Sequence, residues 1–147
     1  MKIHTLGRLV PLLALAATLA AAAPAAAASV SGGIWTGSGN AEVGGVLSEE
    51  FTLPASPASI ELAIGAPLSN NNGRFAATAS IVGHGADGYI GGGLGVGQLK
   101  SNGNSGLIFT GLIGTKIAGP LSVELRVYGG GSSDVGSGAF LGVKLSI

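Results

Sequence analysis

Residues 120–128 read PLSVELRVY, and the side chains in this stretch alternate strictly between two kinds. Aliphatic residues occupy every second position from Leu121 to Val127, and Ser, Glu, Arg and Tyr occupy the positions after them. Successive side chains of a β-strand point to opposite faces of the sheet, so the pattern predicts a strand with one aliphatic and one polar face. The last residues, AFLGVKLSI at 139–147, repeat the alternation.

The same period of two recurs along most of the chain. Six further segments show it with varying clarity: 30–37, 41–53, 58–66, 74–83, 87–98 and 106–117. No segment after residue 28 keeps a helical period, and each of the many glycines there would cost a helix about 1 kcal/mol. We therefore predict an all-β, antiparallel domain of eight strands, most of them near the roughly 9–11 residues that a tilted strand needs to cross a bilayer.

The links between the predicted strands alternate in length. Those at 38–40, 67–73, 100–105 and 129–137 are rich in Asn, Ser and Gly and, except for the first, are the longer ones. Those at 54–57, 84–86 and 118–120 are short. An up-and-down barrel with both chain ends on one side alternates long loops and short turns in this way. A sandwich with Greek-key crossovers has little reason to do so, so we predict an up-and-down β-barrel.

The first 28 residues have the order of regions that is typical of a cleavable secretory signal peptide. Two basic residues precede an apolar run from Leu9 to Ala23, and small residues follow up to Ala28. A membrane-anchoring helix is the alternative, but the run ends at Pro24, before the roughly 20 residues of a stable span. We assign 1–28 to the signal peptide and 29–147 to one barrel domain, with a cut after Ala28 favoured and cuts at neighbouring alanines also permitted.

Charge is scarce in this chain and cysteine is absent. Charged residues make up 10% of the sequence, against roughly 25% in soluble domains. Without Cys there is neither a disulfide framework nor a lipid-modified residue at the cleavage point. Residues 29–147 carry five basic and seven acidic side chains, a formal charge of −2, and have no basic patch for nucleic acid. So few charges indicate that part of the surface does not face water.

Two interpretations of the alternation remain. A soluble barrel keeps its aliphatic face inside and its polar face in water, whereas a membrane barrel reverses the two faces. The polar face here is dominated by Gly, Ser, Thr and Ala, which suits the narrow interior of an eight-stranded barrel. We favour the membrane arrangement; the alternative is a soluble exported barrel that binds a hydrophobic ligand or a partner protein.

In the membrane arrangement the polar face lines the lumen. Its charged residues are Glu42, Glu50, Glu61, Lys116, Glu124, Arg126 and Lys144. They are expected to pair across the interior, because buried charges need partners. Trp35, Tyr128 and Phe140 are expected to fill the remaining space. The glycines at 91, 93, 95 and 97 have two interpretations: a trench that Trp35 occupies, or a strand that needs glycine to bend.

Two features of the predicted outward face run against the membrane arrangement. Its aromatic residues are only Phe51, Phe75 and Phe109, whereas membrane barrels usually carry aromatic girdles at both interfaces. Glu49 also falls on this face, where a charge is acceptable only near an interface or a bulge.

The stretches DGYIGGGLGVG at 87–97, PLSVELRVYGG at 120–130 and AFLGVKLSI at 139–147 share a pattern of glycine and alternating aliphatic residues. Together they resemble the small outer-membrane β-barrel superfamily of Gram-negative bacteria, of the opacity-protein and OmpA-barrel type. The resemblance implies contact with outer-membrane lipid, handling by the barrel-assembly machinery during biogenesis, and a role in adhesion, envelope integrity or narrow, porin-like passage of small solutes. Members of the superfamily commonly end in Phe or Trp, whereas this chain ends in Ile147.

Residues with reactive side chains are few. His84 is the single His after residue 28; it lies in the turn HGAD, and no nucleophile elbow accompanies it. The glycines at 91–97 precede no predicted helix that would bind a phosphate. Asp87 and Asp134 are isolated acids, too few for a calcium site, and the NNN at 70–72 is expected to form a turn, with surface contact as the alternative. We therefore predict no catalytic, cofactor or metal site and a non-enzymatic protein of the outer membrane, with the periplasm or secretion as the alternative.

Overall fold

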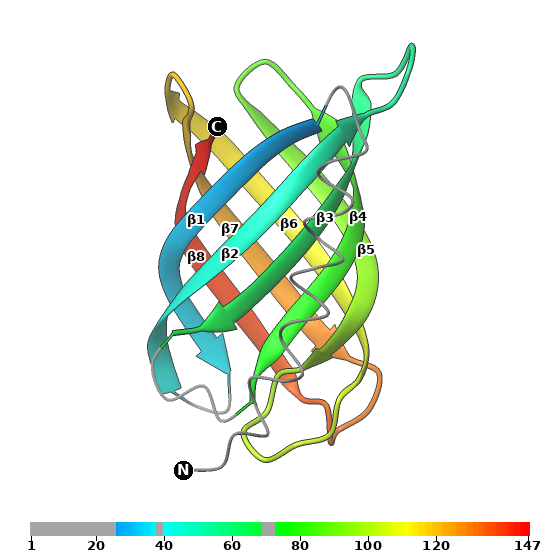
Figure 1. Ribbon diagram of the computed structural model, residues 1–147, viewed down its shortest axis with the longest axis vertical. Helices are drawn as coiled ribbons and strands as arrows, with labels where there is room; N and C mark the ends of the chain where they lie inside the picture. Colours follow the sequence, from blue (N-terminus) through cyan, green and yellow to red (C-terminus); the bar gives the residue numbers. More distant parts are fainter. Residues whose placement is uncertain (1–25, 38–39, 69–72) are drawn as a thin grey trace.

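In the computed structural model, the described residues, 26–37, 40–68 and 73–147, form a closed barrel of eight antiparallel strands (Figure 1). The strands are β1 (Ala26–Gly37), β2 (Asn40–Thr52), β3 (Ala58–Pro67), β4 (Phe75–His84), β5 (Gly88–Gln98), β6 (Gly106–Ala118), β7 (Leu121–Gly130) and β8 (Ser137–Ser146). Each strand pairs with its neighbours in sequence, and β1 pairs with β8 to close the wall. The predicted all-β, up-and-down barrel is confirmed. Within these residues no helix is long and apolar enough to span a membrane.

The predicted strand ranges differ from the observed ones mostly by one or two residues. The exception is β1, which begins at Ala26 rather than at residue 30. Its first three residues, Ala26–Ala28, show no alternation, but they pair with residues 49–51 of β2. Residues 1–25 of the predicted signal peptide and the links 38–39 and 69–72, including the predicted NNN turn, lie outside the described residues.

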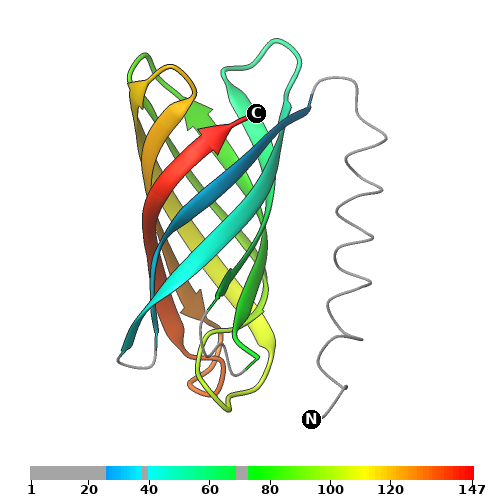
Figure 2. The same cartoon turned by 60° about the vertical axis from the view of Figure 1, so that its left-hand side comes forward.

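The links lie at two ends of the barrel (Figure 2). What we call the terminal end holds the start of β1, the end of β8 and the links 53–57, 85–87 and 119–120. The opposite end, called the loop end, holds the links 99–105 and 131–136. The longer described links therefore gather at one end and the chain ends and shorter links at the other.

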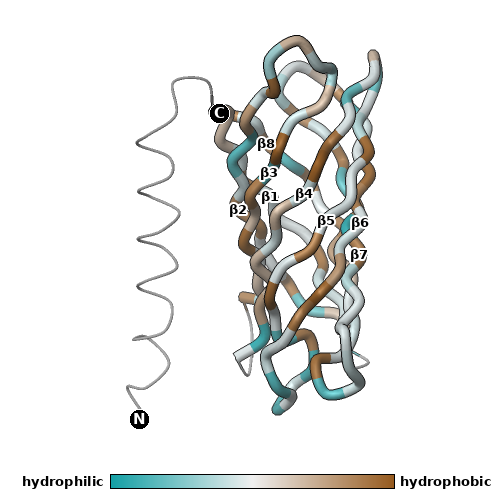
Figure 3. The backbone as a smooth tube through the Cα atoms, turned by 90° about the vertical axis from the view of Figure 1, so that its right-hand side faces the viewer, coloured by the Kyte–Doolittle hydropathy of each residue, from teal (hydrophilic) through white to brown (hydrophobic). Residues whose placement is uncertain are grey.

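Aliphatic side chains cover the outside of every described strand. The exposed large hydrophobic residues of the strands are Val30, Ile34, Val43, Leu47, Ile60, Ile81, Ile90, Leu94, Val96, Leu107, Phe109, Ile113, Ile117, Leu121, Leu125, Val127, Leu141, Val143 and Leu145. Figure 3 shows the resulting hydrophobic stretches along the wall, with hydrophilic residues at the loops below. The residues between them are buried, as at Ser122, Glu124 and Arg126 of β7. The aliphatic face thus points outward and the polar face inward, the reverse of a soluble barrel.

The glycines of β5 allow a close approach to β4. A Cβ added at Gly91, Gly93, Gly95 or Gly97 would lie 1.9–2.7 Å from a backbone oxygen of that strand. Trp35 side-chain atoms are instead the nearest neighbours of Gly44 and Gly65, where an added Cβ would lie 2.9 Å from them. Of the two interpretations offered by the sequence, strand bending is therefore the one that these contacts favour.

The barrel interior as the candidate functional site

Aromatic side chains from three strands fill the lumen toward the loop end. Trp35 of β1 stacks on Tyr128 of β7 with ring centroids 5.1 Å apart, and Phe140 of β8 lies 6.1 Å from Trp35. Leu99 and Val135, from the two loop-end links, are buried in the same cluster. Trp35, Tyr128 and Phe140 were predicted to fill the lumen, whereas no expectation from the sequence covered Leu99 and Val135, which the fold brings to them. We call these five residues the apolar plug.

The two loop-end links bind each other and form a cap over the apolar plug. The backbone N–H groups of Leu99 and Lys100 both donate to the Val135 carbonyl, at 2.9 and 3.0 Å. The Asn104 N–H donates to the Asp134 carbonyl at 3.1 Å. These bonds hold the links 99–105 and 131–136 together as one folded unit rather than as two separate loops.

An ion pair lies beside the cap. The Arg74 guanidinium binds the Glu42 carboxylate and also donates to the Gly37 carbonyl at 3.3 Å. Arg74 is 2% exposed, so its charge is removed from water and needs this partner. Glu42 was predicted to point inward. Arg74 was not among the predicted lumen charges, although in the predicted strand 74–83 it has the parity of the inward residues Thr78 and Ser80.

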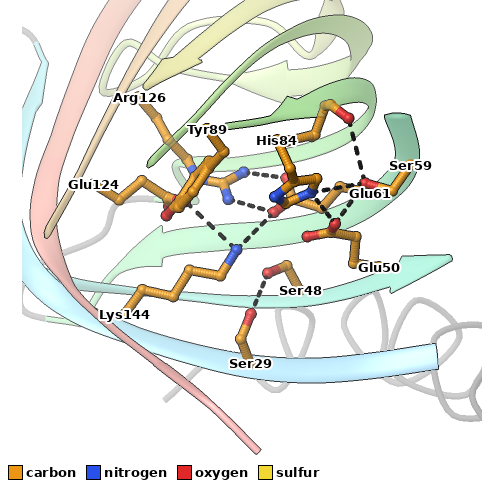
Figure 4. A network of polar contacts seen from close by, with 11 residues as sticks. Ser29, Ser48, Glu50, Ser59, Glu61, His84, Tyr89, Glu124, Arg126 and Lys144 are labelled. Carbon is orange, nitrogen blue, oxygen red and sulfur yellow. Dashed lines mark hydrogen bonds and ion pairs between the residues drawn. The ribbon is translucent and has the colours of Figure 1, made fainter. Parts of the chain in front are cut away.

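Two acids and two bases meet in the middle of the lumen (Figure 4). Arg126 donates to both oxygens of Glu61, at 2.8 and 2.7 Å, and its Nε donates to Glu124 at 2.5 Å. The Lys144 Nζ lies 3.2 Å from Glu61 and 3.6 Å from Glu124. The four side chains are at most 6% exposed, and their formal charges cancel. We call these residues, with Tyr89, the central network.

Tyr89 joins the central network from β5. Its hydroxyl donates to Glu124 at 2.8 Å, and the Lys144 Nζ lies 5.0 Å from the centre of its ring. The ring lies over Gly114 of β6, where an added Cβ would come within 2.1 Å of the Tyr89 Cζ. The absence of a side chain at Gly114 therefore gives the ring its place. Parity puts Tyr89 on the inward face, but no local pattern indicates that it meets Glu124.

A third polar group lies nearer the terminal end. Ser59 donates to Glu50 at 2.5 Å, and the His84 Nε2 lies 3.2 Å from the Ser59 hydroxyl and also contacts Glu50. In a hydrolytic Ser–His–acid triad the acid binds the ring nitrogen that the serine does not use. Here both groups meet the same nitrogen, which suits a structural link between β2, β3 and β4. Among the described residues no cluster of three His, Cys, Asp or Glu side chains could hold a metal ion.

A cavity of about 170 Å³ lies at the terminal end, and we call it the vestibule. Its lining includes Glu50, His84, Lys116 and Ser122, and also Tyr89 and Lys144 of the central network. Lys116 is exposed at its edge, and no ion pair involving it is found in the described part of the chain. The vestibule therefore extends from the terminal end to two residues of the central network, while the described residues of the plug and cap pack together at the loop end.

The predicted lumen charges thus separate into three places. Glu61, Glu124, Arg126 and Lys144 meet in the central network, while Glu42 lies at the loop end. Glu50 and Lys116 lie at the vestibule, and Lys116 does not reach the central network. Lys116 pairs in register with the inward residue Ser122 of β7, and the pairing shifts only after it, so Lys116 keeps its inward parity but lies near the terminal end of the barrel. His84 was missed as a partner because the sequence places it in a turn, whereas it is the last residue of β4.

Comparisons with known proteins give no independent assignment. No protein-family model, curated protein or solved structure matches this chain. Its function has to be inferred from the wall and the interior of the barrel.

Proposed function

We propose that the protein is an integral β-barrel of the outer membrane of a Gram-negative bacterium, with a closed lumen and a structural or surface-interaction role. The ring of outward aliphatic side chains on every described strand carries this proposal. Monomeric soluble proteins rarely expose apolar patches beyond a few hundred Å². A belt around a whole barrel is stable when lipid covers it, and a closed barrel leaves no strand edge unpaired there.

The outward charge distribution supports the same proposal. Within the described strands, Glu49 is the one acidic or basic side chain at an outward position. It lies on β2 level with Ala28, the third residue of β1, and so close to the terminal end. A carboxylate at that level meets the interface rather than the hydrocarbon centre.

The orientation follows from the predicted export and from the two ends of the barrel. Chain ends and short turns of outer-membrane barrels face the periplasm, and longer loops face outward. The terminal end and its vestibule would face the periplasm, and the cap of Asn-, Ser- and Gly-rich links would face the cell exterior. The partners of this protein are then outer-membrane lipid and, during biogenesis, the barrel-assembly machinery.

A narrow porin-like passage is the second candidate role, and the vestibule is the observation in its favour. A solute entering there meets the central network and then the apolar plug, whose Trp35 and Phe140 are fully buried. We therefore expect no steady conductance when the purified protein is added to a planar lipid bilayer. Stable single-channel steps from a preparation free of other porins would favour the passage role.

We propose that the protein has no enzymatic activity. The Ser59, His84 and Glu50 side chains lack the arrangement of a hydrolytic triad, as described above.

The alternative hypothesis is a soluble barrel that binds a hydrophobic ligand. Such a barrel needs an apolar interior, yet the middle of this lumen holds four charged side chains.

Fractionation of the expressed full-length protein tests the membrane proposal. We expect it in the outer-membrane fraction, extractable only with detergent, and migrating differently on a denaturing gel before and after boiling, because closed membrane barrels resist cold detergent. Recovery in the soluble periplasmic fraction without detergent, with no effect of boiling on migration, would overturn it.

A further inference from the structure

The vestibule holds a positive charge without a counter-charge. Its charged lining residues are Lys116, Lys144 and Glu50, a formal charge of +1 with His84 counted as neutral. Glu50 already has partners, because it accepts a hydrogen bond from Ser59 and contacts the His84 Nε2. Lys116 forms no ion pair with any residue that the structure describes. This lysine is therefore available to an anion from outside the chain.

The two lysines of the vestibule stand on either side of one serine. Lys116 of β6 pairs with Ser122 of β7, and Ser122 pairs with Lys144 of β8. Neighbouring strands lie about 4.8 Å apart, so the backbones of the two lysines are roughly 10 Å apart. All three residues line the vestibule. We call Lys116, Ser122 and Lys144 the lysine row, and a single small group can lie between its side chains.

The lysine row keeps hydrogen-bond donors for such a group. A lysine ammonium has three donors. The Lys144 Nζ lies 3.2 Å from Glu61 and 3.6 Å from Glu124, which leaves one of its donors for another acceptor. Lys116 is exposed at the cavity edge, and the Ser122 hydroxyl is a further donor between the two lysines. Three neighbouring strands thus offer donors to the same space.

The acids around the lysine row are paired, and the cavity has room for an anion. Glu50 lies on β2, four strands from β6 in the closed ring, and so on the opposite wall. Glu61 and Glu124 are bound by Arg126 as well as by Lys144, so their charges are balanced. The cavity volume of about 170 Å³ corresponds to about five or six waters at roughly 30 Å³ each. That is enough for a small oxyanion with part of its hydration shell.

We propose that the vestibule binds a small oxyanion, a phosphate or carboxylate group, at the lysine row. The lysine ammonium groups bind it as compact point charges, and the Ser122 hydroxyl donates a hydrogen bond to it. The oxyanion enters from the terminal end, where the vestibule lies. The site uses only inward residues, so it goes beyond the proposed function and does not depend on a membrane around the wall.

Titration with inorganic phosphate, followed by NMR, tests the site. The full-length chain is expressed in a Gram-negative host, purified from whichever cell fraction contains it and held in maltoside micelles, whose headgroups carry no phosphate. At constant ionic strength, we expect the backbone amide signal of Ser122 to shift and to saturate as phosphate is added. The absence of a saturable shift overturns the proposal. A protein recovered as soluble that shows the shift would contradict the membrane proposal and leave this one standing.

Substitutions of lysine test which charge holds the anion. Lys116→Met should weaken phosphate binding roughly tenfold or more, because it removes a charged hydrogen-bond donor. Lys116→Arg keeps the charge and should bind phosphate nearly as the wild type does. The matched control is Lys100→Met, at an exposed lysine of the loop end, which should leave the affinity unchanged. Equal affinities of Lys116→Met and Lys100→Met, or equal losses for Met and Arg at position 116, would overturn the role of this charge.

A second titration identifies the source of the oxyanion. In micelles with phosphocholine headgroups, a site that takes lipid phosphate shows the bound Ser122 signal before any inorganic phosphate is added. A site that takes a soluble anion gives the same titration as in maltoside. We expect the second result, because Ser122 is 5% exposed and faces the lumen rather than the lipid. The first result would keep the oxyanion site and assign it to a headgroup.

Discussion

The Arg126 guanidinium spans the lumen and binds both carboxylate oxygens of Glu61, at 2.8 and 2.7 Å. Arg126 lies on β7 and Glu61 on β3, which are four strands apart in the closed ring and therefore opposite each other. The planar fork of Arg fits a carboxylate with two parallel hydrogen bonds, which a lysine ammonium cannot do. This pair ties two facing walls together at one level of the barrel.

Replacing Arg126 with Met should destabilise the barrel strongly. The substitution removes the hydrogen bonds to Glu61 and Glu124 and leaves two buried carboxylates with only Lys144 as a cation. Breaking a buried pair in this way costs roughly 3–5 kcal/mol. Urea unfolding in lipid vesicles measures the change in free energy. Arg126→Lys, which keeps the charge but not the fork, should lose less unfolding free energy than Arg126→Met. A loss below about 1 kcal/mol for Arg126→Met would contradict the role given to this pair.

An arginine on the outer wall should be costly only in the middle of the apolar belt. Leu125 and Leu121 are both on β7 and both 39% exposed, but Leu121 begins the strand at the terminal end. In lipid, Arg at the bilayer centre costs about 2–4 kcal/mol and near the interface about 0–1 kcal/mol. Leu125→Arg should therefore reduce the unfolding free energy in vesicles far more than Leu121→Arg does. Equal effects at both positions would argue against a membrane around this wall.

Two neighbouring glycines of β5 should differ in their tolerance of alanine. A Cβ at Gly93 would lie 2.0 Å from the Ala79 backbone oxygen, whereas at Gly92 the nearest atom would be the Thr110 oxygen at 3.5 Å. Gly93→Ala forces the backbone of β4 and β5 apart and should cost about 1–3 kcal/mol. Gly92→Ala meets only ordinary contact distances and should change stability little. Comparable urea midpoints for the two variants would contradict the close approach of β4 and β5.

The single Trp of the chain reports on the apolar plug. Trp35 is fully buried, so aqueous iodide should quench its fluorescence weakly in the folded protein and strongly after unfolding. Leu99→Ser removes a fully buried apolar side chain from the plug and should increase quenching in the folded state. Lys100→Ser changes the next residue, which is exposed, and serves as the control. Strong quenching of the folded wild-type protein would show that the loop end is open.

The sequence predicts the wall of this barrel far better than its interior contacts. Alternation from Leu121 to Tyr128 fixes both a strand and its faces, because neighbouring side chains of a strand must point in opposite directions. Ala26–Ala28 have no such contrast, so the true start of β1 follows from pairing with β2 rather than from its own residues.

Interior partners depend on distances around the ring, which local patterns do not encode. Parity places Arg126 and Glu61 inside, but their contact follows from the strand order and from the stagger between strands. Lys116 keeps its inward parity, but it lies near the terminal end of β6 and so lines the vestibule instead of joining the central network. Arg74 stands directly before β4 and His84 ends it; both have the parity of the buried residues of that strand, but no local pattern indicates their partners across the lumen.

The pairing of β1 with β8 has a consequence for how the chain reaches its native state. Ser29 and Ser146 are partners across the closing seam, so the ladder joins residues from nearly the two extremes of the described chain. Contacts this distant in sequence form slowly, because a long loop must close before they contribute. Until then the first and last strands both present unpaired edges beside aliphatic stripes, a combination that favours aggregation. The most vulnerable species of this protein is therefore the almost complete barrel that has not yet joined its ends.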